Sequence, residues 1–365
     1  MSLERIQKNC QGCLLKAREQ KKTEHKILTC SAPLTTLIFR RMKVVISEDT
    51  NKFYGDQIEA LDPSIEIFSL NPENPQSPPW AEVPECDAFF LSYQFLFAVR
   101  DHEELFEPML DLCKKMKFIQ SGYAGMDAPF LQAVLKESQA VIANASSIYG
   151  KPMSHYVLAQ MLRWNKRIDE HAMMQKEKEW MPNGGDGELT DKTLVILGYG
   201  GIGKEVAKLG KTFNMKVTGI RRNPEACDYA DEVLSIDALE ELLPLTDFLV
   251  MVLPDSESTR DIVDTSFLKK MNPSSMLINV GRGSAIVEDD LADALNSGII
   301  AAAALDTTKN EPLEKESKLW DAKNCFITPH DSAHSLMSLP RSFNLFLENL
   351  SNLKDSQPIK NLWEN

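Results

Sequence analysis

Three charged or titratable side chains in the second half of the chain each follow an apolar run that is typical of a buried strand. They are Arg282, Glu311 and His330. In an open parallel sheet, residues at the carboxyl ends of the strands border one crevice. We therefore expect these three side chains to lie together, although any one of them alone would carry little weight.

This combination suits chemistry on an anion that contains a carbonyl group. A guanidinium can hold a carboxylate through two hydrogen bonds and polarise a carbonyl. Histidine can supply a proton to a new alkoxide near neutral pH, and a hydrogen-bonded carboxylate favours its protonated form. The residues therefore predict reduction of a 2-oxo acid, with Arg282 on the substrate, His330 as acid/base and Glu311 supporting His330.

A glycine-rich loop lies upstream of these residues. It fits G-x-G-x-x-G and follows an apolar run at 193–197. In a dinucleotide-binding fold such glycines permit a tight turn and let backbone N–H groups approach a pyrophosphate. A P-loop is excluded, because Glu205 stands where that motif needs a hydroxyl for magnesium. A glycine turn without a ligand is the other reading. We predict a dinucleotide site that includes Gly198, Gly200, Gly201, Ile202 and Gly203.

The end of the next expected strand, 217–220, indicates which dinucleotide binds. An Asp or Glu at this place normally accepts hydrogen bonds from the ribose hydroxyls of NAD. This chain has Arg221 and Arg222 instead. Guanidinium groups pair well with the 2′-phosphate of NADP. The sequence therefore favours NADP(H) over NAD(H), unless these arginines are only solvated surface residues.

The segments that would position these residues alternate between strands and helices. A long helix is expected from Pro152 towards Trp180, with shorter ones near 103–114 and 289–296. The alternation predicts an α/β fold of two Rossmann-like or flavodoxin-like doubly wound parallel-sheet domains with a cleft between them. The expected strands are 44–47, 65–69, 88–92, 117–120, 141–144, 193–197, 217–220, 248–253, 276–280, 302–305 and 326–328.

Composition limits the partners. The 365 residues carry a net charge of −13, which argues against nucleic-acid binding. No apolar run approaches the roughly 20 residues that span a bilayer, so no membrane partner is expected. The seven cysteines show no spacing typical of a disulfide framework, which predicts a reducing, cytoplasmic location.

The first 41 residues differ from the rest, with nine basic and three acidic side chains. We expect a flexible extension, with a mitochondrial presequence as the alternative because the segment is basic and poor in acids. A zinc site is also conceivable, but the segment lacks a second tight ligand pair, and no metal is predicted. Its ligands would be Cys10, Cys13, His25 and Cys30.

Taken in order, the motifs resemble the D-isomer-specific 2-hydroxyacid dehydrogenase family over about residues 42–350. The resemblance implies that Arg282 binds the substrate, that Glu311 pairs with His330, and that Asp306 lies near the nicotinamide carboxamide. The segment from Ser121 to Asp127 resembles the substrate loop of the family, whose backbone N–H groups bind the carboxylate. The matching segments are 198–203, 253–254 with Thr259, 279–283, 306–312 and 328–330.

The remaining contacts are implied by the same resemblance. The substrate would be bound by Tyr123, Ala124 and Gly125. Further cofactor contacts would come from Leu253, Pro254, Thr259, Val280 and Gly281. The chain departs from the family at Ser154-His155-Tyr156, where many members have Ala-Glu, and at 331–334, where small apolar and glycine residues are usual.

The family also implies a domain plan. Residues 1–41 would be the extension, 42–150 plus 332–365 a flavodoxin-like substrate domain, and 151–331 a Rossmann dinucleotide domain. The long helix resembles the dimerisation element, so a homodimer is expected. The leading prediction is an NADP(H)-dependent reductase of a small 2-oxo acid such as glyoxylate or hydroxypyruvate.

Two alternatives stay open. A dinucleotide-sensing, partner-binding protein of the corepressor kind can share this fold. Formate or phosphoglycerate oxidation also occurs in the family, but its formate enzymes tend to carry Gln where Glu311 stands.

Overall fold

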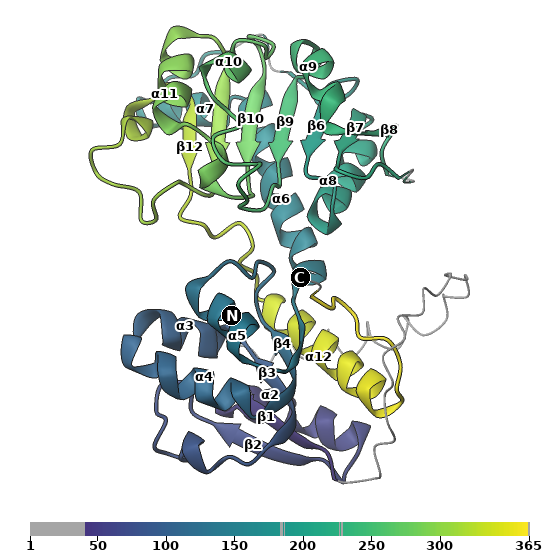
Figure 1. Ribbon diagram of the computed structural model, residues 1–365. Coiled ribbons are helices and arrows are strands. Elements are labelled where there is room, and N and C mark those ends of the chain that lie inside the picture. Colours follow the sequence, from purple (N-terminus) through teal and green to yellow (C-terminus); the bar gives the residue numbers. More distant parts are fainter. Residues whose placement is uncertain (1–40, 183–184, 186, 226, 228, 364–365) are drawn as a thin grey trace. The chain divides into compact units, whose positions relative to one another are not determined.

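The computed structural model describes residues 41–365, apart from 183–184, 186, 226, 228 and 364–365 (Figure 1). The expected extension, with its candidate zinc ligands, therefore lies outside the described residues except for Arg41. No described helix is long and apolar enough to cross a membrane. The described strands form two sheets, in which all neighbouring strands are parallel.

The first sheet has five strands in the order β2-β1-β3-β4-β5. This is the flavodoxin-like order of a doubly wound fold. Helices α3, α4 and α5 cover one face of the sheet, and α2 and α12 cover the other. The elements are β1 (Lys43–Ser47), α2 (Glu48–Leu61), β2 (Glu66–Leu70), β3 (Cys86–Leu91), α3 (Tyr93–Asp101), α4 (Phe106–Lys114), β4 (Met116–Ser121), α5 (Pro129–Glu137), β5 (Val141–Ala143) and α12 (Ser338–Lys354).

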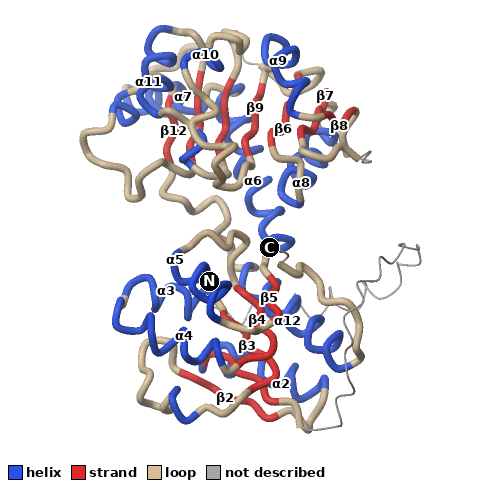
Figure 2. The backbone as a smooth tube through the Cα atoms, in the orientation of Figure 1, coloured by secondary structure: helices blue, strands red, loops and turns tan. Residues whose placement is uncertain are grey.

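The second sheet has seven strands in the order β12-β11-β10-β9-β6-β7-β8. From β8 to β11 the strands have the 3-2-1-4-5-6 order of dinucleotide-binding sheets, and β12 is added at the far edge. Helices α9, α10 and α11 cover one face, and α6 and α8 cover the other (Figure 2). The elements are α6 (Ser146–Asn165), α7 (Ile168–Lys176), β6 (Thr193–Leu197), α8 (Gly201–Thr212), β7 (Lys216–Ile220), β8 (Glu232–Leu234), α9 (Leu239–Leu242), β9 (Phe248–Met251), α10 (Thr265–Leu268), β10 (Met276–Asn279), α11 (Glu288–Ser297), β11 (Ala302–Leu305) and β12 (Cys325–Ile327).

Short 3-10 helices complete the connections. They are η2 (Trp80–Glu82), η3 (Glu103–Leu105), η4 (Ile236–Ala238), η5 (Leu243–Leu245), η6 (Gly283–Ala285) and η7 (Lys318–Asp321). The α/β class with two parallel sheets agrees with the sequence prediction. The apolar runs became strands because both faces of each sheet are covered, so that every residue of β9, β10 and β11 is buried.

The expected single helix from Pro152 to Trp180 is wrong. Helix α6 begins at Ser146, so Pro152 lies inside it rather than at its first turn. Proline removes one N–H and usually ends a helix, but Ile148 and Gly150 are buried and their packing holds the first turns together. The helix ends at Asn165, and Arg167 has a left-handed φ of 49° before α7 begins.

Strand β8 was also missed, because it is a three-residue edge strand whose side chains are at most half-buried. The proposed domain boundaries stay a prediction. Residues 150 and 151 lie within α6, and residues 41–365 cluster as one compact unit. The carboxyl-terminal helix α12 packs on the first sheet, where Phe346 stacks on Phe90 at 5.1 Å between ring centroids.

Candidate active site

The ends of three neighbouring strands carry the residues that the sequence singled out. Arg282 follows β10, Glu311 follows β11 and His330 follows β12, and these strands lie side by side in the sheet. Parallel strands bring their carboxyl ends to one edge. The expected proximity is therefore present. His330 contacts Glu311, and the charge of Arg282 lowers the pKa of both groups.

The His330–Glu311 pair is the closest contact of this group. Nδ1 of His330 lies 2.7 Å from Oε2 of Glu311. This hydrogen bond raises the pKa of His330, while burial and the charge of Arg282 act in the opposite direction. Burial opposes ionisation of Glu311, but hydrogen bonds from His330 and the Thr308 N–H keep its pKa below the ordinary value. The pair therefore favours imidazolium beside carboxylate.

Arg282 is held by an aspartate that the sequence analysis did not assign. Its Nε and Nη2 donate to the two carboxylate oxygens of Asp127 at 2.7 and 2.9 Å, and Nη1 donates to the Gly281 carbonyl at 3.0 Å. The hydrogen bond from Arg282 lowers the pKa of Asp127, and the same bond raises the pKa of Arg282. One hydrogen on each Nη remains for a further acceptor. Asp127 thus fixes the guanidinium without using all its donors.

The segment from Ser121 to Asp127 leads into the loop after β4, and two of its backbone carbonyls accept hydrogen bonds. The Tyr123 carbonyl accepts from Ala145 N–H at 2.8 Å, and the Ala124 carbonyl accepts from Asn144 Nδ2 at 3.1 Å. The Tyr123 N–H donates to Ser121 Oγ at 3.1 Å. The N–H groups of Ala124 and Gly125 have no hydrogen-bond acceptor among the described residues.

Gly125 lies directly against the guanidinium. A Cβ atom at this position would come within 2.1 Å of Arg282 Nη2. The loop after β4 therefore touches the strand-end arginine, and a side chain at position 125 would displace the guanidinium and the Asp127 carboxylate from their present places. We call residues 121–127, which lead from β4 towards α5, the β4–α5 loop.

The glycine loop leaves room next to its backbone. Gly198 has a φ of +105°, and a Cβ there would lie 2.5 Å from the Val252 carbonyl oxygen, so the fold itself requires glycine. At Gly200 and Gly201, in contrast, a Cβ would meet no described atom within 4 Å apart from the adjoining backbone. Helix α8 begins at Gly201 without a side-chain cap. The N–H groups of its first turn, at Gly201, Ile202 and Gly203, are therefore free for an anion, and these residues fit a dinucleotide pyrophosphate.

The two arginines follow β7, which neighbours β6. Arg221 lies 3.4 Å from the Glu225 carboxylate, and Arg222 is exposed. Neither guanidinium is buried, so both are accessible to a ligand at the carboxyl end of this strand.

The other expected cofactor residues line the loops after β9 and β10. A Cβ on Gly281 would come within 2.7 Å of the Leu253 backbone, so these two loops touch. Val280 is buried. Thr259 closes its own loop, because its hydroxyl donates to the Pro254 carbonyl at 2.7 Å and accepts from the Ser256 N–H at 3.0 Å.

Asp306 holds the loop that carries His330. Its side chain is 1% exposed. Oδ1 accepts hydrogen bonds from Thr328 Oγ1 at 2.7 Å, from the Asp331 N–H at 3.0 Å and from the Ser332 N–H at 3.1 Å. The expected contact of Asp306 with a nicotinamide remains a prediction. The role that its hydrogen bonds show is to hold the backbone on the carboxyl side of β12.

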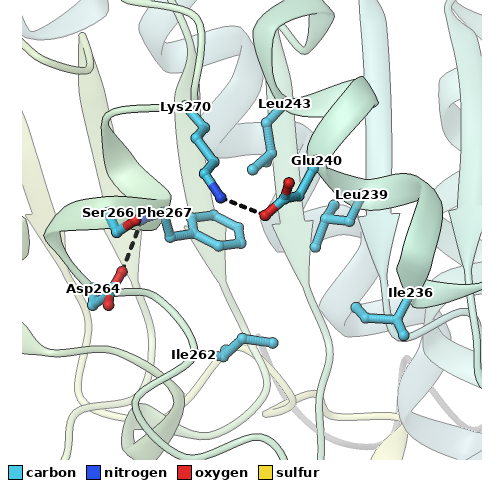
Figure 3. A pocket seen from close by; sticks show the side chains of 9 residues that line it. All are labelled: Ile236, Leu239, Glu240, Leu243, Ile262, Asp264, Ser266, Phe267 and Lys270. Atoms are coloured by element: carbon cyan, nitrogen blue, oxygen red, sulfur yellow. Dashed lines mark hydrogen bonds and ion pairs between the residues drawn. The ribbon is translucent and has the colours of Figure 1, made fainter.

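A pocket of about 260 Å³ lies elsewhere, between α9 and α10 (Figure 3). None of the expected site residues lines it. Its rim carries an ion pair between Lys270 and Glu240. No group of three or more potential metal ligands occurs in the part of the chain that the structure describes.

Comparison with known proteins gives consistent matches. The model of the NAD-binding domain of D-isomer specific 2-hydroxyacid dehydrogenases matches residues 158–332. A hydroxypyruvate reductase of Blautia hydrogenotrophica is 30% identical in an alignment of 267 residues that covers 69% of this chain and 80% of that protein.

Solved structures extend the likeness to most of the chain. A D-isomer specific 2-hydroxyacid dehydrogenase family protein from Aeromonas salmonicida has a TM-score of 0.73 and 30% identity, covering 89% of this chain and 99% of that one. An NADPH-dependent glyoxylate/hydroxypyruvate reductase from Sinorhizobium meliloti, solved with NADP and sulfate, has a TM-score of 0.71 and 23% identity over 89% of this chain and 98% of that one. The second likeness concerns the fold alone.

Proposed function

Because the chain belongs to the D-isomer specific 2-hydroxyacid dehydrogenase family, we propose that it reduces a small 2-oxo acid of the glyoxylate or hydroxypyruvate kind with NADPH. Membership makes the chain an NAD(P)-dependent dehydrogenase. The observation that carries the proposal is the His330–Glu311 hydrogen bond of 2.7 Å beside Arg282 at the ends of adjacent strands. This arrangement combines a proton donor with a cationic substrate clamp.

We assign the following roles to the protein residues in the reduction. The dinucleotide, when bound, supplies the hydride that adds to C2 of the oxo acid. The free hydrogens on the two Nη atoms of Arg282 bind the carboxylate and the carbonyl oxygen, and the Ala124 and Gly125 N–H groups complete the carboxylate site. Nδ1 of His330 is engaged by Glu311, so Nε2 delivers the proton to the new alkoxide.

The experiment is an assay with a panel of 2-oxo acids. Purified protein is mixed with NADPH or NADH and with glyoxylate, hydroxypyruvate, pyruvate or bulkier analogues, and the absorbance of reduced nicotinamide is followed. Turnover of the small acids supports the proposal. Tight dinucleotide binding without turnover of any acid would instead favour a sensing, partner-binding protein.

Glu311→Gln is expected to shift the pH profile of reduction. The imidazole must be protonated to act as the acid, so the rate falls as the pH rises through the His330 pKa, which Glu311 holds above its usual value. The neutral amide removes this support, and the pKa of His330 falls, because burial and the charge of Arg282 still lower it. The alkaline decline of kcat/KM then begins at lower pH. Glu314→Gln, an exposed carboxylate in the same loop, is the control, and an unchanged profile for Glu311→Gln would contradict the assignment.

Replacing Arg221 and Arg222 together by alanine is expected to weaken NADPH binding about 10- to 100-fold, the worth of one or more charge-assisted hydrogen bonds. NADH binding should change little, because NADH lacks the 2′-phosphate. Fluorescence titration with each dinucleotide measures both affinities without turnover. Arg100→Ala, at an exposed arginine paired with Asp101 on α3, is the control. Equal losses for both dinucleotides would refute the preference for NADP(H).

The homodimer is also part of the proposal. Four large apolar side chains of α7 and the segment after it are exposed on the chain described here. They are Ile168, Met173, Trp180 and Met181. A second copy would cover such residues, and helices α6 and α7 are the elements from which we expect the interface.

A further inference from the structure

A chain of hydrogen bonds runs from helix α6 to the loop of His330. The hydroxyl oxygens of Tyr156 and Thr328 lie 2.9 Å apart, and Thr328 Oγ1 lies 2.7 Å from Asp306 Oδ1. A carboxylate only accepts, so the single hydroxyl proton of Thr328 goes to Asp306. Tyr156 must then donate to Thr328. Burial raises the pKa of Tyr156 to about 12, so this donor keeps its proton near neutral pH.

The loop of His330, where this series of hydrogen bonds ends, has an unfavourable backbone conformation that hydrogen bonds must stabilise. His330 has a φ of +55°, a left-handed conformation that is uncommon for residues other than glycine. The His330 N–H donates to the Asp306 carbonyl at 2.8 Å, and the next two N–H groups donate to the Asp306 carboxylate. A buried carboxylate needs all of its donors, and Thr328 is the only side-chain donor that the described residues provide to it.

We propose that Tyr156 is a positioning residue for the acid/base step, holding His330 in line with Glu311 through Thr328 and Asp306. This inference rests on the proposed function and goes beyond it, because Tyr156 lies on a helix and contacts His330 only through these intermediates.

The same helix offers a comparison residue. The Tyr149 hydroxyl donates to the Gly122 carbonyl in the β4–α5 loop. Tyr149 and Tyr156 are seven residues apart in α6, which places them on one face of the helix, two turns from each other. One tyrosine therefore contacts the loop expected to bind the carboxylate, and the other contacts the loop of the proton donor.

These contacts predict different kinetic effects for two matched variants. Tyr156→Phe keeps the ring and loses the donor, and should lower kcat about 5- to 10-fold with KM changed less than about twofold, the worth of one hydrogen bond. Tyr149→Phe should act mainly on KM. Tyr54→Phe removes a phenol hydroxyl from α2, a helix that carries none of the residues we assign to the site, and its kcat and KM should stay those of the unmodified protein.

Variants of Thr328 test whether Tyr156 acts through the Thr328 hydroxyl. Thr328→Ser keeps the hydroxyl and should retain most activity, whereas Thr328→Val should resemble Tyr156→Phe. The double variant Tyr156→Phe/Thr328→Val should be no worse than Thr328→Val alone, because both changes break one path. Additive losses, or a kcat unchanged by Tyr156→Phe, would overturn the proposal.

A second readout does not depend on turnover. The imidazole resonances of His330, assigned by comparison with His330→Ala, are titrated by NMR. The charged groups that face His330 are Glu311 and Asp306, which raise its pKa, and Arg282, which lowers it. In Tyr156→Phe and Thr328→Val the loosened contact with Glu311 should lower the His330 pKa. An unchanged titration would contradict the positioning role, whereas a lowered pKa in a protein that reduces no oxo acid would contradict only the proposed function.

Discussion

Replacing His330 by alanine is expected to lower kcat/KM for the reduction of the 2-oxo acid by about 10²- to 10⁴-fold, the usual contribution of a positioned acid. The reason is specific to this site. Among the described residues, His330 is the histidine whose Nδ1 lies within hydrogen-bond distance of a carboxylate, at 2.7 Å from Glu311, and this bond favours the protonated form. In the alanine variant, the alkoxide must take its proton from water.

The measurement is steady-state reduction together with fluorescence titration of the dinucleotide. Because the expected loss lies in the chemical step, dinucleotide affinity should stay within about twofold of the unmodified protein. His102→Ala is the matched control, since His102 is an exposed histidine that lies 3.7 Å from Glu104 and outside the site. A variant at His330 that retains more than a tenth of the rate would show that another group supplies the proton.

Several features of this site were predictable because they depend on chain-local rules. Apolar runs become buried strands, and the carboxyl ends of parallel neighbours share one edge, which is why Glu311 and His330 could be paired from the amino-acid sequence alone. The glycine loop was equally local. Its tight turn at Gly198 and the open positions at Gly200 and Gly201 follow the pattern of a strand, a loop and a helix.

Other features depend on contacts between distant segments, and these were missed. Asp127 was only the last residue of a glycine-containing loop, and nothing near it in sequence indicates Arg282, 155 positions away. The start of α6 was missed for a similar reason: local rules place proline in a first turn, whereas buried Ile148 and Gly150 extend the helix ahead of Pro152. Tertiary packing decided both outcomes.

The second large effect is expected at Arg282. Arg282→Ala removes the group that we assign to the substrate carboxylate and carbonyl, and should lower kcat/KM about 10³-fold or more, the worth of two charge-assisted hydrogen bonds. Arg282→Lys should recover little. The lysine ammonium cannot replace a planar guanidinium whose Nε and Nη2 bind Asp127 while the other Nη hydrogens bind the substrate.

The Asp127 carboxylate provides a second test of the role assigned to Arg282. In Arg282→Ala it loses the partner whose hydrogen bond lowers its pKa, and it is left as a negative charge beside the position of an anionic substrate. Asp127→Asn in the Arg282→Ala background should therefore recover part of the loss, mainly as a lower KM. In the unmodified protein, Asp127→Asn should instead lower kcat/KM, because the guanidinium loses the charged acceptor that orients it. A change of sign between the two backgrounds, measured with one substrate at one pH, would establish that Asp127 acts through Arg282. The same sign in both would place Asp127 on the substrate directly.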